Sequence, residues 1–425
     1  MISRNLLLLV SITTAAWTQV PLQLTLREAE ALALKNHPAI DAAELNALAS
    51  RERIAQFESV RHPFVTANVT GAAAPEQSRL AAGGLNNPLV LSRFSTGVSV
   101  SQLLFDFGRT SQLVEGSRLA SLAESEKTKA TRADVILNVQ RIYYTALGTK
   151  TLVEIAKQTI AARQLLVDQV SALVQAQMKS GLDLSIANTN LAEARLLLSA
   201  AENGRLSAHA QLAEAVGMSR AVPIELAEEP MPNVEPLSAT ELNERALRDR
   251  PEIGAARLEA ESLSSVAEAE RALRFPSVTA SVGAGLIPAR VKELSSEYVA
   301  GGLNVSIPFL NGGLFKARRR EAEFRAQSAQ RRTRLVENAV SREVSVALLD
   351  VATAAERVTL TQQFIEQASQ AVELAQARYD LGLSSIIELS QAQLVKTSAE
   401  IQHSNARYDY QIRRAILNHR AGAIR

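Results

Sequence analysis

The chain has 425 residues, a formal net charge of +2 and no cysteine. Without cysteine it has no disulfide, thiolate metal site or thiol nucleophile, and the near-neutral charge gives no reason to expect a polyanionic partner. Apolar residues make up 47% of the chain but aromatic residues only 4%. This composition favours thin seams between helices over a thick mixed core.

Residues 1–18 have the pattern of a secretory signal peptide. Arg4 supplies a positive charge, Leu6–Val10 an apolar stretch and Thr14–Ala16 small residues near a cleavage point. No other stretch approaches the roughly 20 apolar residues that a membrane helix needs. If the chain crosses a membrane, we therefore expect it to do so by strands.

Identical residues recur at a constant separation of 213 positions, which indicates an internal duplication. The recurring residues are Leu24, Glu28, Ala33, Leu34, Pro38, Ile40, Arg61 and Pro63, matched by Leu237, Glu241, Ala246, Leu247, Pro251, Ile253, Arg274 and Pro276. Further along, Gly108 is paired with Gly313 and Gly181 with Gly382, 205 and 201 positions apart. The predicted organisation is a first repeat over 19–222, a proline-rich linker over 223–238 and a second repeat over 239–425.

Each repeat begins with a helix, at about 26–59 and 239–274. Each then continues, after its strands, into a much longer helix. No proline lies between Pro88 and Pro223 or after Pro308, so helices over about 109–179 and 314–381 are permitted. Glycines at Gly181 and Gly382 predict tight turns into return helices. At 1.5 Å per residue the second long helix would extend roughly 100 Å, which requires an elongated, antiparallel coiled-coil body rather than a globule.

The stretches 64–74, 95–104, 277–286 and 299–308 predict four strands with a period of two. Val65, Ala67 and Val69 alternate with small polar residues, and the other stretches repeat the pattern. About 8–11 residues is the length that a tilted strand needs to cross a bilayer. Four strands cannot close a barrel, and open edges are not tolerated in lipid. A membrane location would therefore require several copies of the chain.

The runs Leu103–Arg109 and Ile307–Gly313 each join a predicted strand to a predicted long helix. With these runs and this layout, the chain resembles the outer-membrane efflux protein family typified by TolC, whose strand-to-helix junctions look like them. The runs Lys179–Leu182 and Arg378–Leu383 look like its helical-hairpin tips, and Ala406–Tyr410 is similar to its last helix. The resemblance covers essentially the whole chain after the signal peptide.

The resemblance implies a fold that is mainly α with a small β part. A long antiparallel coiled-coil α-barrel would join a 12-stranded transmembrane β-barrel, to which each chain of a homotrimer adds four strands. It implies a passive, gated exit duct of a tripartite efflux or type I secretion system, in the outer membrane of a Gram-negative-type bacterium and extending into the periplasm. The implied partners are outer-membrane lipid, a periplasmic adaptor (membrane fusion) protein and, indirectly, an inner-membrane pump. No enzyme activity, cofactor or nucleic acid is implied.

Three groups of site residues follow from the resemblance. The periplasmic aperture or gate would use Glu388, Gln391, Tyr379 and Ser384. The adaptor-contact tips would be Gly181, Leu182, Gly382 and Leu383. The strand–helix junctions would be Phe105, Asp106, Gly108, Phe309, Asn311 and Gly313.

Glu388 lies where the family has an acidic constriction, whereas Ala187 is taken as its counterpart in the first repeat. Gln391 and Ser384 stand where an aspartate and a latch arginine are typical of the family. Without the resemblance, Glu388 is an ordinary exposed helix glutamate and the two glycines are plain helix stops. Gating chemistry is therefore expected mainly in the second repeat.

Two other readings of the chain are a soluble periplasmic coiled-coil scaffold or adaptor and a secreted hydrolase. The hydrolase is disfavoured because no nucleophile–base constellation is present. The five histidines are scattered without metal-ligand spacing. A basic run over 316–334 has few interleaved aromatics, so we interpret it as a solvated helix face near the strands rather than as a nucleic-acid site.

Overall fold

The computed structural model describes residues 22–73, 93–218, 224–228, 230–231, 238–287 and 295–424. The predicted signal peptide and most of the predicted linker lie outside these residues. Contacts divide the chain into two compact units. Unit 1 comprises Met1–His37, Val135–Pro236 and Leu349–Ile416, and unit 2 comprises Pro38–Asp134, Leu237–Leu348 and Leu417–Arg425. Each unit thus takes segments from both predicted repeats.

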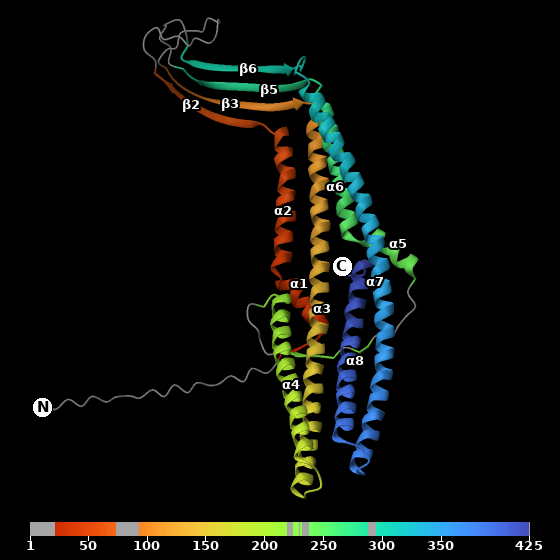
Figure 1. Cartoon of the computed structure of the whole chain (residues 1–425). Helices are drawn as coiled ribbons and strands as arrows, with labels where there is room; N and C mark the ends of the chain where they lie inside the picture. Colours follow the sequence, from red (N-terminus) through yellow and green to blue (C-terminus); the bar gives the residue numbers. More distant parts are fainter. Residues whose placement is uncertain are drawn as a thin grey trace, which may run out of the picture. The chain divides into compact units, whose positions relative to one another are not determined.

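The described part is mainly helical, with a small β part (Figure 1). The helices are α1 Leu26–Asn36, α2 Pro38–Glu58, α3 Arg109–Gln175, α4 Gly181–Ala215, α5 Ala239–Asp249, α6 Pro251–Ala272, α7 Leu314–Asp380 and α8 Ile386–Arg420, with a 3-10 turn at Ser59–Arg61. The strands are β1 Leu22–Leu24, β2 Phe64–Ala72, β3 Arg93–Phe105, β4 Ile224–Leu226, β5 Ser277–Leu286 and β6 Glu297–Ser306.

The helices occur in two sets of matching length. α1 and α5 have 11 residues each, α3 and α7 have 67 each, and α4 and α8 have 35 each. The first residues of α1 and α5, which precede the strands, are 213 positions apart. The first residues of α3 and α7, and those of α4 and α8, are 205 positions apart. Contacts recur at the same offsets: Thr128 Oγ1 donates to the carbonyl of Ala43, and Thr333 Oγ1 donates to the carbonyl of Ala256, both over 3.1 Å.

The two shorter helices expected over 26–59 and 239–274 are each broken in two, so this expectation was wrong. The breaks fall before Pro38 and Pro251, and the preceding residues His37 and Arg250 have extended backbones with ψ of 118° and 124°. The proline ring disfavours the helical conformation in the residue before it. Each proline then starts the next helix, where its missing N–H costs nothing.

The strands β2, β3, β5 and β6 form one antiparallel sheet in that order, within unit 2 (Figure 1). Their bounds differ from the predicted strands by at most two residues at each end. The order leaves β2 and β6 as the two edges. The backbone N–H and C=O groups on the outer sides of β2 and β6 are therefore free to pair with another strand.

The strand register confirms the predicted division of the sheet into two faces. Val65, Val100 and Val282 are cross-strand partners in one row, and Ala67, Val98 and Ala284 in another. The alternate rows carry small polar residues, such as Thr66 beside Ser99, whose hydroxyl groups are 2.7 Å apart. Because neighbours in register share a face, the sheet has one apolar and one mostly small, polar side.

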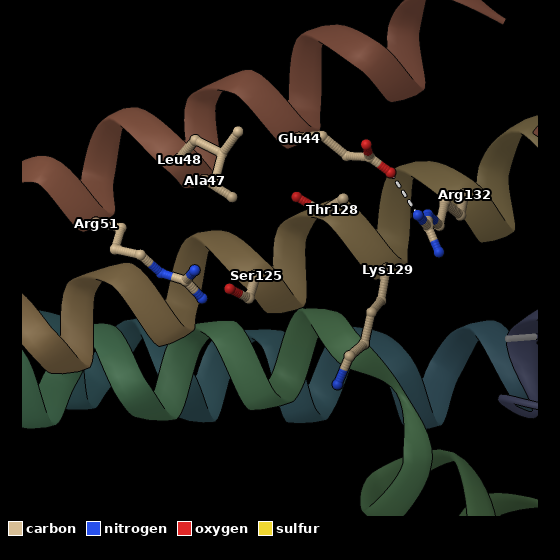
Figure 2. A pocket seen from close by; sticks show the side chains of 8 residues that line it. All are labelled: Glu44, Ala47, Leu48, Arg51, Ser125, Thr128, Lys129 and Arg132. Atoms are coloured by element: carbon tan, nitrogen blue, oxygen red, sulfur yellow. Dashed lines mark hydrogen bonds and ion pairs between the residues drawn. The ribbon is translucent and has the colours of Figure 1, made fainter. Parts of the chain in front are cut away.

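Four helices of unit 2 form successive seams. Arg132 of α3 is paired with Glu44 of α2, at one side of a groove of about 350 Å³ (Figure 2). Ser262 of α6 donates to the carbonyl of Gly116 on α3 over 2.6 Å. Arg257 of α6 and Glu337 of α7 are 2.8 Å apart. The contacts therefore run in the order α2, α3, α6, α7.

Unit 1 contains a parallel two-stranded ladder that the sequence did not suggest, β1 with β4. The buried Tyr143 of α3 donates its hydroxyl toward the carbonyls of Leu24 and Ala227, over 2.9 and 2.7 Å. These contacts tie the ladder to the long helix. In the part of the chain that the structure describes, no helix is long and apolar enough to cross a membrane.

Candidate functional sites at the helix tips and the strand–helix junctions

The tip between α3 and α4 differs from the prediction. α3 ends at Gln175, four residues before the expected Lys179, and the left-handed residue of the turn is Gln177, with φ of 58°. The N–H of Met178 donates to the carbonyl of Leu173 over 2.8 Å, which is the bond that closes such a turn. Gly181 is not the stop of α3. It is the first residue of α4.

The tip between α7 and α8 agrees with the prediction. Gly382 has φ of 74°, and the N–H of Leu383 donates to the carbonyl of Arg378 over 2.8 Å. This conformation is easily adopted by glycine because it has no Cβ. The glycine therefore ends α7 at Asp380.

The two tips correspond at a separation of 205 residues, not 201. Gln177 matches Gly382, and Ser180 matches Ser385. The counterpart of Glu388 is consequently Asp183 rather than Ala187, which is buried. Ser180 and Asp183 form a capping box at the start of α4, and the N–H of Glu388 donates to Ser385 Oγ over 3.4 Å. Each tip thus presents an acidic residue in the first turn of its return helix, where the helix dipole stabilises a carboxylate.

Basic residues lie beside Glu388 and Tyr379. Arg378 Nε is 3.3 Å from Glu388 Oε1, and both side chains are about half exposed. Lys179 Nζ lies 4.6 Å from the centroid of the Tyr379 ring. With Asp380 and Asp183 included, the tips of one chain carry three acidic and two basic side chains among these residues.

Tyr379 is buried where the two hairpins pack together in unit 1. The surrounding cluster contains Leu166, Val167, Val170, Ala187, Leu191, Ala375, Ile386 and Leu389. Its hydroxyl has no hydrogen-bond partner among the described residues. Burial, followed by the negative charges of Asp183 and Asp380, raises the pKa of Tyr379.

Ser384 and Gln391 complete the predicted aperture set. The Ser384 hydroxyl is buried and has no partner within the described part of the chain, whereas Gln391 is exposed on α8. Two polar contacts join the hairpins further from the tips. Asn190 donates to Ser390 Oγ over 2.8 Å, and the buried Arg163 donates to Gln393.

The predicted contact residues at the tips are exposed. Leu182 and Leu383 have 68% and 67% of their surface accessible. Three further exposed apolar residues, which were not predicted from the sequence, lie beside them: Met178, Leu381 and Ile387. The sequence does contain a signal for these residues, because each is an apolar residue next to a turn between two stretches of helical pattern. Exposed apolar side chains gathered at a helix end are typical of a protein-contact surface.

At the first strand–helix junction, Asp106 caps α3. Its Oδ2 accepts hydrogen bonds from the N–H and the hydroxyl of Thr110, over 2.8 and 2.6 Å. Phe107 and Gly108 have positive φ angles of 55° and 85°. At the second junction Gly312 and Gly313 take these two positions with φ of 59° and 85°, so the predicted equivalence of Gly108 and Gly313 is reproduced.

Aromatic side chains gather at the first junction. The ring centroids of Phe105 and Phe107 are 4.7 Å apart, and those of Phe107 and Phe275 are 5.1 Å apart. At the second junction Asn311 follows Phe309 and Leu310, which are almost fully exposed. Exposed rings at the end of a sheet with one apolar face fit a boundary between lipid and water.

The described residues give no support for a catalytic site in the groove or for a metal site. The groove in Figure 2 is lined by three basic residues, one glutamate and small or aliphatic side chains, with no nucleophile–base pair among its lining residues. The described residues contain no group of three or more acidic or histidine side chains placed to hold a metal ion.

The sequence matches a profile of the family described as outer membrane efflux protein over residues 31–218 and 242–423. The outer membrane protein OprJ of Pseudomonas aeruginosa is 25% identical over 398 residues, covering 90% of this chain and 81% of the relative. The cation efflux system protein CusC of Escherichia coli is 25% identical over 380 residues, covering 85% and 78%.

Solved structures share the fold. A membrane protein from Pseudomonas aeruginosa aligns with a TM-score of 0.81 at 22% identity, over 93% of each chain. The CmeC outer membrane channel of Campylobacter jejuni aligns with a TM-score of 0.77 at 18% identity, over 93% of this chain and 85% of CmeC.

Proposed function

The chain belongs to the outer membrane efflux protein family, and on that premise we propose that three copies form one gated exit duct. The protein is an efflux channel of the outer membrane. The finer proposal is that each copy adds four strands to a 12-stranded barrel and two helical hairpins to a periplasmic tunnel. The duct is a passive conduit and catalyses no reaction.

The two-faced sheet with two unpaired edges is the observation that carries the proposal. Its apolar rows, such as Val65, Val100 and Val282, suit contact with lipid, and its rows of serine, threonine and glycine suit a wet lumen. Edge strands in a bilayer must be paired because lipid offers no hydrogen bonds. Pairing β6 of one copy with β2 of the next supplies the missing bonds, and a closed ring of three copies has no edge left.

The tips support the proposed docking to a periplasmic adaptor. Leu182 and Leu383 are exposed on neighbouring turns of unit 1, beside charged groups. An apolar surface with a polar rim is the usual anatomy of a protein interface. Through that adaptor an inner-membrane pump would drive transport. Asp183, Glu388 and Tyr379 would form the closed aperture, with Gln391 and Ser384 beside them.

We further propose that the chain arose by duplication, with repeats over 19–222 and 239–425 joined by the linker 223–238. The equal helix lengths and the recurrent contacts support this origin. Residues 1–18 would direct secretion and be removed. The alternative function is that of a soluble periplasmic scaffold, which needs no lipid-facing strands.

Reconstitution in a planar bilayer tests the duct. The detergent-solubilised protein should have the mass of three chains by light scattering and should produce discrete conductance steps. Heat-dissociated protein at the same concentration serves as the control. A monomer that is extracted without detergent and leaves the bilayer conductance unchanged would instead establish the soluble scaffold.

A further inference from the structure

A cavity of about 260 Å³ within unit 2 is lined by residues of both strand–helix junctions. The two matching series of elements contribute residues at equivalent positions. Val60 and Leu273 are 213 positions apart, and Leu103 and Pro308 are 205 positions apart. The cavity is therefore a product of the way the two junctions come together, and neither junction forms it alone.

The sheet residues that line the cavity lie on the polar face of the sheet. Ser277 and Ser306 are cross-strand partners, and Leu103 is the partner of Thr279, two residues after Ser277. Because alternate residues of a strand share a face, Leu103, Ser277 and Ser306 belong to the same side. This is the side that the proposed duct turns toward its lumen.

Arg109 brings a positive charge to this cavity without an acceptor for it. The side chain is partly buried, and its Nε is buried with no hydrogen-bond partner among the described residues. Asp106 also lines the cavity, but its Oδ2 accepts from the N–H and the hydroxyl of Thr110. A guanidinium that is withdrawn from water without an acceptor is unfavourable, so an anion bound here would relieve that cost.

The second junction shows that the fold does not require an arginine at this position. The residue equivalent to Arg109, 205 positions later, is Leu314. Both junctions nevertheless have the same pair of positive φ angles, and both lead into a helix of 67 residues. A leucine is sufficient for the turn, so the charge of Arg109 is an addition that the turn itself does not explain.

The surroundings of the cavity favour an anion with an apolar body. Arg274 follows Leu273, and its Cζ is 4.7 Å from the centroid of the Phe275 ring, which lines the cavity. Lys316 is exposed directly after Phe315, a second aromatic lining residue. These cations raise the local potential for a negative ligand, and the two rings offer aromatic surface to a flat apolar group.

The size and charge of the site restrict the ligand further. Drug-sized ligands occupy pockets of about 300–1,000 Å³, so a cavity of about 260 Å³ fits a smaller molecule with one ring. A guanidinium binds a carboxylate through two parallel hydrogen bonds. The carboxylate of Asp106 would repel a second negative charge on the ligand.

We propose that this cavity binds a singly charged aromatic carboxylate. The carboxylate of the ligand accepts hydrogen bonds from Arg109, and its ring packs against Phe275 and Phe315. The placement of the site in the wall of the duct rests on the proposed function, which it deepens by naming a class of solute that the wall can hold.

Fluorine NMR of para-fluorophenylacetate with the detergent-solubilised protein tests the site. The signal of this probe should broaden with the natural chain and recover when unlabelled phenylacetate is added. Arg109→Leu, which copies the residue of the second junction, should weaken binding by about tenfold or more, because the charge-assisted hydrogen bonds are lost. Equal affinity of the two proteins would overturn the proposal.

The matched control is Arg332→Leu, which removes an exposed arginine that does not line the cavity. It should bind the probe like the natural chain, and it measures any uptake of the probe by the detergent. Arg109→Lys retains the charge without the planar set of donors, so its affinity should be intermediate. If Arg109→Leu does not assemble, an undiminished affinity of Arg109→Lys would overturn the site.

Two competitors identify what the cavity recognises. Phenylacetamide has the same shape as phenylacetate without the charge, and acetate has the charge without the ring. Neither should displace the probe at concentrations at which phenylacetate does. Displacement by phenylacetamide as effective as that by phenylacetate would reduce the site to an apolar cavity, and equally effective displacement by acetate would reduce it to an unspecific anion site. Either result would overturn the proposal.

Light scattering and bilayer conductance of the same preparations separate this proposal from the duct. A channel-forming trimer that binds the probe equally with and without Arg109 would overturn the carboxylate site alone. A protein that binds the probe through Arg109 but forms no channel would confirm the carboxylate site and overturn the duct, together with the assignment of the cavity to its wall.

Discussion

The ammonium group of Lys179 lies 4.6 Å from the centroid of the Tyr379 ring, so the tip of the first helical hairpin is joined to the second within unit 1. The two residues are 200 positions apart in the chain. The ring is buried, and its hydroxyl has no partner among the described residues. Packing and the cation, rather than a hydrogen bond, therefore hold this contact within the chain.

Substitutions at Tyr379 should separate packing from hydrogen bonding. Tyr379→Ala leaves a cavity between the hairpins and should cost about 3–5 kcal/mol of unfolding free energy. Tyr379→Phe keeps the ring and removes only an unpaired hydroxyl, so the stability should stay nearly unchanged. Urea unfolding of the purified protein measures both. A large loss with phenylalanine would mean that another copy bonds to the hydroxyl.

The acidic residues of both tips should control ion selectivity. Glu388→Gln and Asp183→Asn should each lower the preference for potassium over chloride, and the double variant more than either, because carboxylates near a narrow aperture attract cations. Reversal potentials in a salt gradient give the ratio. The control is Asp168→Asn, which changes an exposed acidic residue that lies before the end of α3. If only the Glu388 substitution changed the preference for potassium over chloride, the gating chemistry would belong to the second repeat alone.

The buried Arg250 should stabilise unit 2 in a pH-dependent way. It donates to Glu252 and Glu343 over 2.8 Å each. Burial raises the pKa of Glu252, but the hydrogen bonds and charge of Arg250 outweigh it, so the pKa is lowered overall. This contribution is present above the unfolded pKa of about 4.3 and is lost as the pH falls through the lower folded value.

Arg250→Leu should therefore cost about 1.5–3 kcal/mol at pH 7, and the difference from the natural chain should shrink as the pH falls below about 4. Thermal melts followed by circular dichroism across that range check the effect. Arg257→Leu breaks only the more exposed pair with Glu337 and should cost about 1 kcal/mol or less. A pH-independent loss for Arg250→Leu would point to packing alone.

Two glycines with left-handed backbones should respond differently to alanine. Gly217 and Gly422 have φ of 75° and 71°, so either substitution should cost roughly 1–2 kcal/mol of backbone strain. At Gly217 the new Cβ would also lie 2.6 Å from the carbonyl oxygen of Asn36, whereas at Gly422 the nearest atom is 3.3 Å away. Gly217→Ala should accordingly lower the melting temperature more, and equal shifts would contradict the clash.

The strand faces and the helix starts could be predicted from the sequence, while the first tip could not. Period two alone assigned Val65, Thr66 and their neighbours to the correct faces, because side chains alternate along any strand. The tip was misplaced because glycine usually supplies the left-handed residue, and here Gln177 does so. Because of that error, Ala187 rather than Asp183 was predicted to be the counterpart of Glu388.

What the sequence by itself determined about this protein was its layout: two matched series of helix, two strands and a long hairpin, with junctions at Gly108 and Gly313. These features depend on local rules of period, proline and backbone freedom, which operate over a few residues. Only the tertiary structure decided which groups meet, such as Lys179 with Tyr379 and Arg250 with Glu343. Such contacts join residues tens to hundreds of positions apart, and they depend on how the long helices align side by side, which no local pattern records.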